Sequence, residues 1–330
     1  MMEQKRVLVT GSTGFIGIHL VRALLLRGHE VSCLLRGVSR RQSLEGLSIT
    51  PVNGDYLRPE TLRAAVKGMN WVFHLGAVIK ADDWETYYRV NTLGTRNLVE
   101  ACCAEDSGMP RLVYVSSIAA SGPSLPGVLK QESDPCAPIN FYGESKRLAE
   151  EACRKYVGRI PIVIVRPPNI LGYGQKDLYR LMRLIHGRIL PRLGLRERRT
   201  SICFVEDLVD ALILTAESDR APGETYFVTN NEKCSWFEMV DSIAQSLNRT
   251  RGVIHIPYKA LVLLAGLSKA VALLTRNSPL VSRDWIENPR LYDFLYSSAK
   301  IQLELGFRPR VKWETGLKEI IERYRKDGLL

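Results

Sequence analysis

The sequence predicts an α/β fold: a doubly wound parallel sheet with a smaller, mainly helical C-terminal lobe. Over residues 7–165, short apolar runs of the buried-strand type alternate with segments that have apolar residues at helical spacing. A glycine-rich turn at residues 10–17 separates the first apolar run from the first helical segment. This alternation is typical of parallel strands that are joined by right-handed crossover helices and covered on both faces.

The elements follow one another in order along the chain. Gly28 closes the first helix, and Pro59 stands near the first turn of the second, where proline is tolerated. Strands are expected at 7–10, 31–35, 49–52, 71–75, 112–115 and 160–165, and helices at 16–27, 59–66, 84–103 and 141–156. Beyond residue 166, turn-rich segments alternate with helices expected at 177–186, 207–217, 236–247, 258–274 and 313–325, and a run at 225–228 is expected to add a strand to the main sheet.

The composition is that of an ordinary globular protein, with 45% hydrophobic and 25% charged residues. Lys and Arg number 46 and Asp and Glu 35, so the formal net charge is +11. The basic residues are dispersed, apart from Arg36, Arg40, Arg41 and the run at 188–199. We therefore expect local anionic ligands or a solvated basic face, and no nucleic-acid partner.

The seven cysteines indicate a reducing compartment. Their number is odd, and none has the spacing of a metal site, so we expect no bound metal. The first residues lead directly into an apolar strand without the apolar core of a signal peptide. The apolar segment at 260–275 is interrupted by Lys269 and falls short of the ~20 apolar residues of a membrane span. We expect a cytoplasmic protein.

The turn at residues 10–17 has the pattern of a dinucleotide-binding loop. Gly11 permits the tight turn, Gly14 lets the backbone approach a pyrophosphate, and Gly17 lets the helix pack closely against the sheet. The helix that follows offers unpaired N–H groups and a partial positive charge to the phosphates. Three glycines alone are a weak signal, but their place between the first strand and the first helix makes it much stronger.

The end of the second strand bears on which dinucleotide is bound. A carboxylate there binds the 2′-hydroxyl of NAD, whereas an arginine suits the 2′-phosphate of NADP. This chain has Arg36, followed by Arg40 and Arg41, and its next carboxylate is Glu45. We expect NADP, with NAD as the alternative; the arginines could also be merely solvated.

A catalytic set is suggested by Tyr142 and Lys146, whose i, i+4 spacing puts them on one face of a helix. A nearby ammonium and the positive charge of an oxidised nicotinamide would favour the phenolate and bring the pKa of the tyrosine closer to neutrality. Ser116 and Ser117 close the fifth strand, at the edge of the sheet where ligands bind, and a hydroxyl there can donate to a substrate oxygen.

The order of these motifs resembles that of the extended short-chain dehydrogenase/reductase family, also called the NAD(P)-dependent epimerase/dehydratase family. The resemblance covers most of the first 230 residues and is closest to the branch of steroid dehydrogenases and dihydroflavonol reductases. It rests on residues 10–17, 54–55, 74–77, 90–95, 115–117, 142–146, 166–169 and 205–207.

The resemblance implies an NADP-binding Rossmann domain over residues 1–165, which 204–230 rejoins, and a region at 166–330 that mostly binds substrate. It also implies a homodimer built from the helices at 84–103 and 141–156. Ser117 matches the catalytic serine of the family better than Ser116, and Gly76 stands where the family often has alanine, a change expected to be harmless. The implied catalytic residues are Ser117, Tyr142 and Lys146, and the implied cofactor contacts are Gly11, Thr13, Gly14, Phe15, Ile16, Gly17, Arg36, Asp55, Tyr56, Leu75, Gly76, Ala77, Asn91, Val115, Tyr142, Lys146, Pro167 and Asn169.

The expected reaction is hydride transfer between a secondary alcohol and a ketone. Sugar dehydratases of the family place acidic residues after the catalytic serine, where this chain has 118-Ile-Ala-Ala-120. The alternative is a nucleotide-sugar epimerase with Arg192, Arg196, Arg198 or Arg199 on the diphosphate, and a third possibility is a dinucleotide-binding scaffold without turnover. The apolar stretch at 260–274 is expected to pack within the lobe, to line an apolar pocket or to touch a membrane surface.

Overall fold

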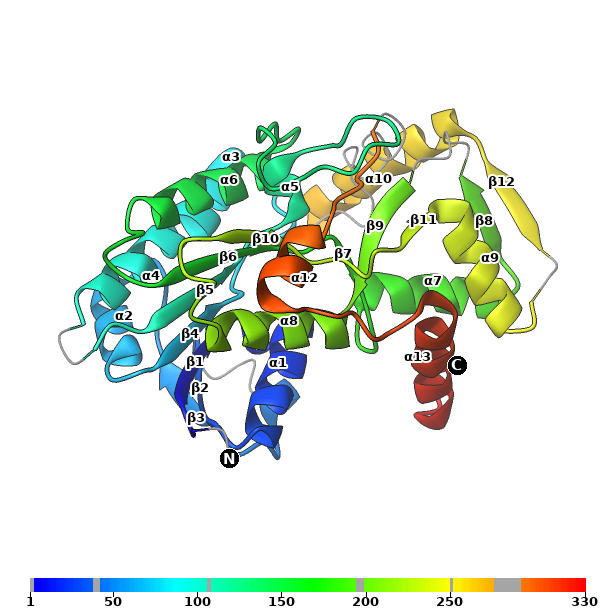
Figure 1. Cartoon of the computed structure of the whole chain (residues 1–330). Helices are drawn as coiled ribbons and strands as arrows, with labels where there is room; N and C mark the ends of the chain where they lie inside the picture. The colour runs from blue at the N-terminus through cyan, green and yellow to red at the C-terminus, as the bar shows by residue number, and fades with distance from the viewer. Residues whose placement is uncertain (1–2, 38–41, 106–107, 194–198, 250–251, 276–291) are drawn as a thin grey trace.

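The structure, a computed structural model, describes residues 3–37, 42–105, 108–193, 199–249, 252–275 and 292–330. Within these residues, seven parallel strands form a central sheet in the order β10-β6-β5-β4-β1-β2-β3 (Figure 1). The strands are β1 (Arg6–Thr10), β2 (Glu30–Leu35), β3 (Thr50–Asn53), β4 (Trp71–His74), β5 (Arg111–Val115), β6 (Ile162–Arg166) and β10 (Thr225–Phe227). β10 pairs with β6, so the run at 225–228 adds a strand to the main sheet as expected.

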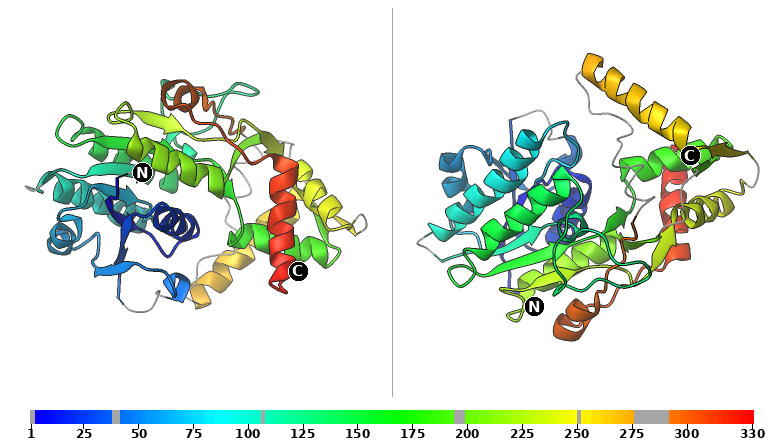
Figure 2. Two further views of the ribbon diagram at one scale, coloured as in Figure 1. Left: turned by 60° about the horizontal axis from the view of Figure 1, so that its bottom comes forward. Right: turned by 90° about the horizontal axis from the view of Figure 1, so that it is seen from above.

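Both faces of the sheet are covered by helices, which makes it doubly wound (Figures 1 and 2). Val7 and Val9 of β1 belong to an apolar cluster with α1 (Phe15–Leu26) and α8 (Val205–Glu217). Leu8, which points to the opposite face, belongs to a second cluster with α2 (Pro59–Val66), α4 (Gly94–Cys103) and α6 (Phe141–Arg154). The alternation of side chains along a strand thus builds two cores from one sheet.

The C-terminal region lies to one side of the sheet, on the right in Figure 1, and contains strands as well as the predicted helices. A core of its own joins three helices to β9. The predicted helices found there are α7 (Lys176–His186), α9 (Trp236–Ser246), α10 (Tyr258–Thr275) and α13 (Trp313–Lys326). The strands, which the sequence did not predict, are β7 (Asn169–Leu171), β8 (Leu190–Leu193), β9 (Arg199–Phe204), β11 (Lys233–Ser235) and β12 (Val253–Ile256). Helix α12 (Ala299–Leu305), also not predicted, packs instead against the core of the main sheet. In the described residues, β11-β9-β7 and β12-β8 form two small sheets.

The prediction of a single helix over residues 84–103 is wrong in the middle of that range. The chain forms α3 (Trp84–Tyr87), then a π-helical segment η2 (Tyr88–Leu93), and only then α4. The wider π turn carries Asn91 and Thr92, which are buried against α6. π segments of this kind are frequent at functional sites, and their presence depends on tertiary contacts that a helical periodicity does not reveal.

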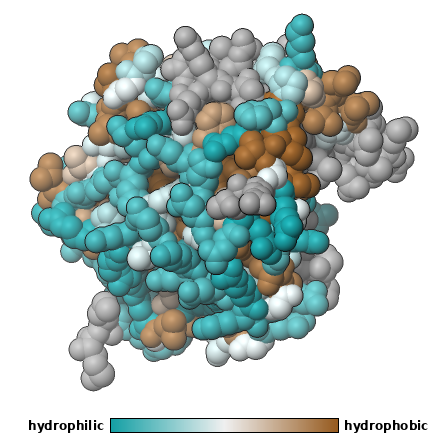
Figure 3. Space-filling model, turned by 90° about the vertical axis from the view of Figure 1, so that its right-hand side faces the viewer, coloured by the Kyte–Doolittle hydropathy of each residue, from teal (hydrophilic) through white to brown (hydrophobic). Residues whose placement is uncertain are grey.

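Helix α10 is partly packed and partly exposed. Leu261 and Ala265 are buried against Trp236, whereas Leu263 and Leu267 are exposed. The side of the molecule seen in Figure 3 carries apolar patches among polar ones. Among the described residues, no helix combines the length and hydropathy that a bilayer span requires.

Candidate active site

The carboxyl ends of the parallel strands meet at one edge of the sheet. Thr10 of β1 is in register with His74 of β4, which in turn is in register with Tyr114 of β5. The segments that follow these strands, at 11–17, 75–77 and 116–117, therefore lie along the same edge, with β1 and β4 at its centre. In a doubly wound sheet this is the place where the strand order reverses and ligands bind.

The glycine turn is held in shape by its neighbours. Gly11 has φ of 68°, a left-handed conformation, and a Cβ on it would lie 2.7 Å from the backbone nitrogen of Gly76. A Cβ on Gly17 would lie 2.2 Å from the carbonyl oxygen of Gly11. Gly14 precedes α1, and among the described residues no side chain caps this helix and its first turn has no acidic residue. An uncapped, acid-free helix start behind a tight glycine turn fits a pyrophosphate.

The other predicted cofactor contacts of the turn range from exposed to partly buried. Thr13 is partly exposed and Gly14 is exposed. Phe15 and Ile16 are partly buried against the cluster that packs α1 on the sheet. Phe15 also stacks edge-on against His19, with ring centroids 5.5 Å apart.

Tyr56 explains why a glycine stands at position 76. A Cβ on Gly76 would lie 1.9 Å from the Tyr56 hydroxyl oxygen, and a Cβ on Gly94 would lie 2.8 Å from the Tyr56 Cβ. Tyr56 is thus buried beneath the segment 75–77, while the neighbouring Asp55 is partly exposed and accepts a hydrogen bond from the backbone N–H of Leu57 at 3.0 Å. The glycine that differs from the family pattern is required by the packing of this tyrosine.

A buried chain of hydrogen bonds runs behind this edge of the sheet. The imidazole of His74 lies between the hydroxyls of Thr10 (Nδ1 to Oγ1, 2.7 Å) and Thr95 (Nε2 to Oγ1, 2.9 Å). Because the Thr95 hydroxyl donates to the carbonyl of Asn91 at 2.6 Å, its oxygen accepts from Nε2–H. Burial lowers the pKa of His74 to about 3, so the imidazole is neutral.

Asn91 connects the end of β4 to helix α6. Its side-chain N–H₂ donates to the carbonyl of Val78 (2.9 Å) and to the hydroxyl of Ser145 (3.0 Å), and its oxygen accepts from the N–H of Val78 (2.8 Å). The sequence singled out Asn91 but gave no role to its partners Ser145 and Thr95, or to His74 and Thr10, which continue the chain of hydrogen bonds from Thr95. Ser145 lies between Tyr142 and Lys146, and that position was the only signal for it.

Helix α6 presents Tyr142 and Lys146 to the end of β5. Lys146 is 2% exposed, its Nζ donates to the carbonyl of Val115 at 2.8 Å, and it lies 4.3 Å from the centroid of the Tyr114 ring. Ser117 caps the short helix α5 (Ile118–Ser121) by accepting from the N–H of Ala119 at 3.1 Å. A hydrogen bond between the Ser117 hydroxyl and the Tyr142 phenol lowers the pKa of the latter.

The protonation of this pair is dominated by burial. Burial raises the pKa of Tyr142 to about 12, in spite of the hydrogen bond from Ser117. Burial also lowers the pKa of Lys146 to about 7, and the charge of Glu150 opposes that change. The chain's own groups therefore hold the phenol protonated at neutral pH, the opposite of the effect expected from Lys146 and a nicotinamide charge together. A protonated phenol is the form that donates a proton.

Residues that follow β6 and β2 were also predicted to contact the cofactor. Pro167 is buried, and its carbonyl accepts from the N–H of Ile118 at 3.1 Å, which ties the end of β6 to α5. Asn169 is exposed at the start of β7. Arg36 is exposed just after β2, and its charge lowers the pKa of Tyr56, against the larger effect of burial. Arg40 and Arg41 lie outside the described residues.

Two of the arginines considered for a diphosphate, Arg192 and Arg199, form ion pairs with carboxylates of α9. Arg192 pairs with Asp241 at 2.5 Å, and Arg199 pairs with Glu238 at 3.1 Å. Arg196 and Arg198 lie outside the described residues, as does Trp285. Among the residues that the structure describes, no group of His, Cys, Asp and Glu side chains is arranged so that it could hold a metal ion.

An apolar cavity lies beyond α5. Its volume is about 590 Å³, and its wall is formed largely by the segment 123–128 and Tyr292. Lys130, on the same wall, donates from Nζ to the carbonyl of Ser121 at 2.6 Å, which holds the segment to α5. The wall is therefore continuous with the helix that Ser117 caps.

Three comparisons with known proteins agree with this geometry. The model of the NAD dependent epimerase/dehydratase family matches residues 7–228. The chain is 29% identical to 3-beta-hydroxysteroid dehydrogenase of Mycolicibacterium neoaurum, over 97% of this chain and 91% of that protein. It is 32% identical to UDP-glucose 4-epimerase of Vibrio cholerae, over 82% of this chain and 85% of that protein. The solved structure of MoeE5 in complex with UDP-glucuronic acid and NAD is 25% identical, covers 98% of this chain and 99% of that one, and superposes with a TM-score of 0.78.

Proposed function

Because the chain belongs to the NAD-dependent epimerase/dehydratase family, we propose that it is an NADP-dependent oxidoreductase that interconverts a secondary alcohol and a ketone. The family places it among enzymes of the extended short-chain dehydrogenase/reductase type that act on small molecules. The observation that carries the proposal is the arrangement at the end of β5, where Ser117, Tyr142 and Lys146 lie beside the glycine-lined edge of the sheet. In the balanced reaction, alcohol and NADP⁺ yield ketone, NADPH and one proton.

Each of the three side chains has a role that its surroundings support. A bound nicotinamide supplies the hydride or accepts it. The Ser117 hydroxyl donates to the substrate oxygen and steadies the charge that develops there. Tyr142 donates its proton to that oxygen during ketone reduction and takes it back during alcohol oxidation. Lys146, buried beside Val115, places a positive charge one helical turn from the phenol and binds the nicotinamide ribose.

An uncharged substrate is supported by the sequence after Ser117 and by one of the relatives. The segment 118–120 after Ser117 has no acidic side chain for dehydration. Arg192 and Arg199 pair with carboxylates rather than face a diphosphate. The relative from Mycolicibacterium neoaurum is named for a hydroxysteroid. We propose that the region at 166–330 mostly binds this substrate, while 1–165 and the segment 204–230, which contains α8 and β10, form the cofactor domain.

A nucleotide-sugar epimerase is the second candidate, since the relative from Vibrio cholerae is a UDP-glucose 4-epimerase. The two functions differ in net redox change. We expect purified protein to consume NADPH stoichiometrically with a 3-ketosteroid or a long-chain ketone and to leave UDP-glucose and UDP-galactose unconverted. The loss of NADPH is followed by its absorbance, and the sugar nucleotides are separated by chromatography. Conversion of a UDP-sugar without net NADPH change would establish the epimerase instead.

Arg36 is expected to bind the 2′-phosphate of NADP. Replacement Arg36→Ala removes a charge-assisted hydrogen bond worth about 1.5–3 kcal/mol, which corresponds to a Kd for NADPH raised about 10–150-fold. The Kd for NADH should change by less than about twofold, since NADH has no phosphate there. Both values are measured by cofactor fluorescence, with Arg63→Ala on the exposed face of α2 as the control. Equal losses for the two cofactors would contradict the preference for NADP.

The homodimer and the cytoplasmic location are likewise proposals. Phe141, at the start of one of the two helices expected at the dimer interface, is 56% exposed, which suits an apolar contact. The seven cysteines are free thiols, which suits a reducing compartment.

A further inference from the structure

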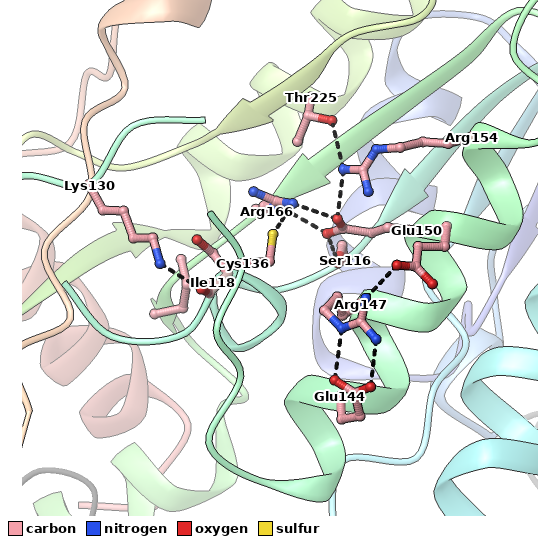
Figure 4. A network of polar contacts seen from close by, with 12 residues as sticks. Ser116, Ile118, Lys130, Cys136, Glu144, Arg147, Glu150, Arg154, Arg166 and Thr225 are labelled. Atoms are coloured by element: carbon pink, nitrogen blue, oxygen red, sulfur yellow. Dashed lines mark hydrogen bonds and ion pairs between the residues drawn. The ribbon is translucent and has the colours of Figure 1, made fainter. Parts of the chain in front are cut away.

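A buried ion pair lies directly behind the proposed catalytic side chains. The side chains of Glu150 on α6 and Arg166 at the end of β6 are 0% and 1% exposed. Arg166 donates twice, from Nε to Oε1 at 2.8 Å and from Nη2 to Oε2 at 2.6 Å. Arg154 adds a third hydrogen bond, to Oε2 at 2.9 Å (Figure 4).

The pair connects three parts of the site. The hydroxyl of Ser116, next to Ser117, donates to Oε1 of Glu150 at 2.6 Å. Glu150 stands one helical turn after Lys146 on α6, on the same face of the helix. Arg166 directly precedes Pro167, whose carbonyl holds α5. A single carboxylate therefore links the end of β5, the end of β6 and the helix that carries Tyr142 and Lys146.

Stability alone does not account for this arrangement. Removing two charges from water costs several kcal/mol per ion, and replacing a buried pair by apolar residues is often neutral or stabilising. The Arg166 side of the pair is less polar, because the guanidinium lies 5.5 Å from the centroid of the Phe227 ring and donates to the Cys136 sulfur at 3.1 Å. A charge kept in such surroundings is more easily explained by its effect on a neighbour.

That neighbour is Lys146. The groups that face it are the Tyr114 ring and the Val115 carbonyl from β5, the neutral His74 from β4, and Glu150 and Cys153 from α6. In the described part of the chain, Glu150 is the carboxylate among them. Its charge raises the pKa of Lys146, against the larger lowering by burial.

We propose that Glu150 is a positioning residue for the catalytic set: it holds the ends of β5 and β6 against α6 and supplies the negative charge that keeps Lys146 an ammonium. Arg166 holds the Glu150 carboxylate in place. The inference rests on the proposed function, because it assigns Glu150 a role through Lys146.

The test is the substitution Glu150→Gln, which keeps the shape and the acceptor for Ser116 but removes the charge. The Kd for NADPH is measured by fluorescence between about pH 5.5 and 9, and kcat is measured over the same range with the ketone that turns over fastest. We expect the midpoint at which Lys146 loses its proton to fall by at least about one pH unit, a tenfold loss of ammonium at a given pH. The matched control is Glu151→Gln, the next residue of α6, whose carboxylate pairs with Arg147 at the surface and whose loss should leave the midpoint unchanged.

A second variant covers the case in which Glu150→Gln does not fold. The double substitution Glu150→Met with Arg166→Met removes both charges at similar volume, and we expect it to fold and to show a smaller fall in midpoint, because the loss of the Arg166 charge partly offsets the loss of the Glu150 charge. A folded variant of either kind with the wild-type midpoint would overturn the proposal, as would an equal shift in Glu151→Gln. The Kd profile needs no substrate, so it decides the role of Glu150 even if no ketone turns over and the proposed function fails.

Discussion

The substitution Tyr142→Phe is expected to lower kcat for ketone reduction by about 10²–10⁴-fold, the usual contribution of a general acid. The phenol is the proposed proton donor, and burial raises its pKa to about 12, which favours the protonated form at neutral pH. Phenylalanine keeps the ring, which lies 6.1 Å from the Tyr87 ring, so the packing of α6 is retained. Steady-state kinetics with NADPH give kcat, and fluorescence titration should give an unchanged Kd for the cofactor.

The control for this experiment is Tyr156→Phe, which removes a hydroxyl that bonds Glu100 near the far end of α6. It should leave both kcat and the cofactor Kd unchanged. Turnover of Tyr142→Phe at the wild-type rate would remove the proposed mechanism. Absence of turnover in the wild type itself, together with normal cofactor binding, would instead favour the dinucleotide-binding scaffold.

The substitution Gly17→Ala is expected to weaken NADPH binding at least about 100-fold, equivalent to about 2.7 kcal/mol. The added methyl group would lie 2.2 Å from the Gly11 carbonyl oxygen and 2.7 Å from the Ser12 Cα, and both belong to the backbone of the phosphate turn. Backbone cannot rotate away as a flexible side chain can, so the turn must move off the start of α1. Overpacking of this kind also costs about 1–3 kcal/mol of stability, which denaturant unfolding measures.

Gly28→Ala separates the loss of binding from the loss of stability. Gly28 follows the same helix with φ of 81°, and a Cβ there would meet nothing within 4 Å. Alanine should therefore cost about 1–2 kcal/mol of stability through its left-handed backbone alone and leave the cofactor Kd unchanged. A Gly17→Ala protein that binds NADPH like the wild type would mean that the phosphates lie elsewhere.

Much of the central sheet could be predicted because its signals are local. The alternation of Val7, Leu8 and Val9 between two cores follows from the two-residue period of a strand. The spacing of Tyr142 and Lys146 requires only that α6 be a helix. The short strands β7 and β11, by contrast, are made by pairing with β9, which comes from a distant part of the chain, and three residues carry little pattern of their own.

The candidate site was less predictable, because the role of each polar side chain depends on hydrogen-bond and ion-pair partners from distant parts of the chain. From the sequence, a glycine at position 76 in place of alanine was expected to be harmless. The structure shows why glycine is needed there, because a side chain would collide with Tyr56. Arg192 and Arg199 were considered for a diphosphate, yet each has a carboxylate partner from α9. The π turn at Asn91 interrupts a segment whose periodicity predicts one continuous helix. The hydrogen bonds of Asn91 with Val78 and Ser145 join residues far apart in the sequence, so a local pattern does not reveal them.

The six strands of the central sheet from β1 to β6, the glycine turn and the tyrosine–lysine pair were determined by the sequence alone, since each depends on residues a few positions apart. The tertiary structure decided which charges are buried and what they face: the neutral His74, the protonated Tyr142 and the Glu150–Arg166 pair behind Lys146. The physical reason is that the cost of removing a polar group from water, and the partners that offset it, come from segments that only folding brings together.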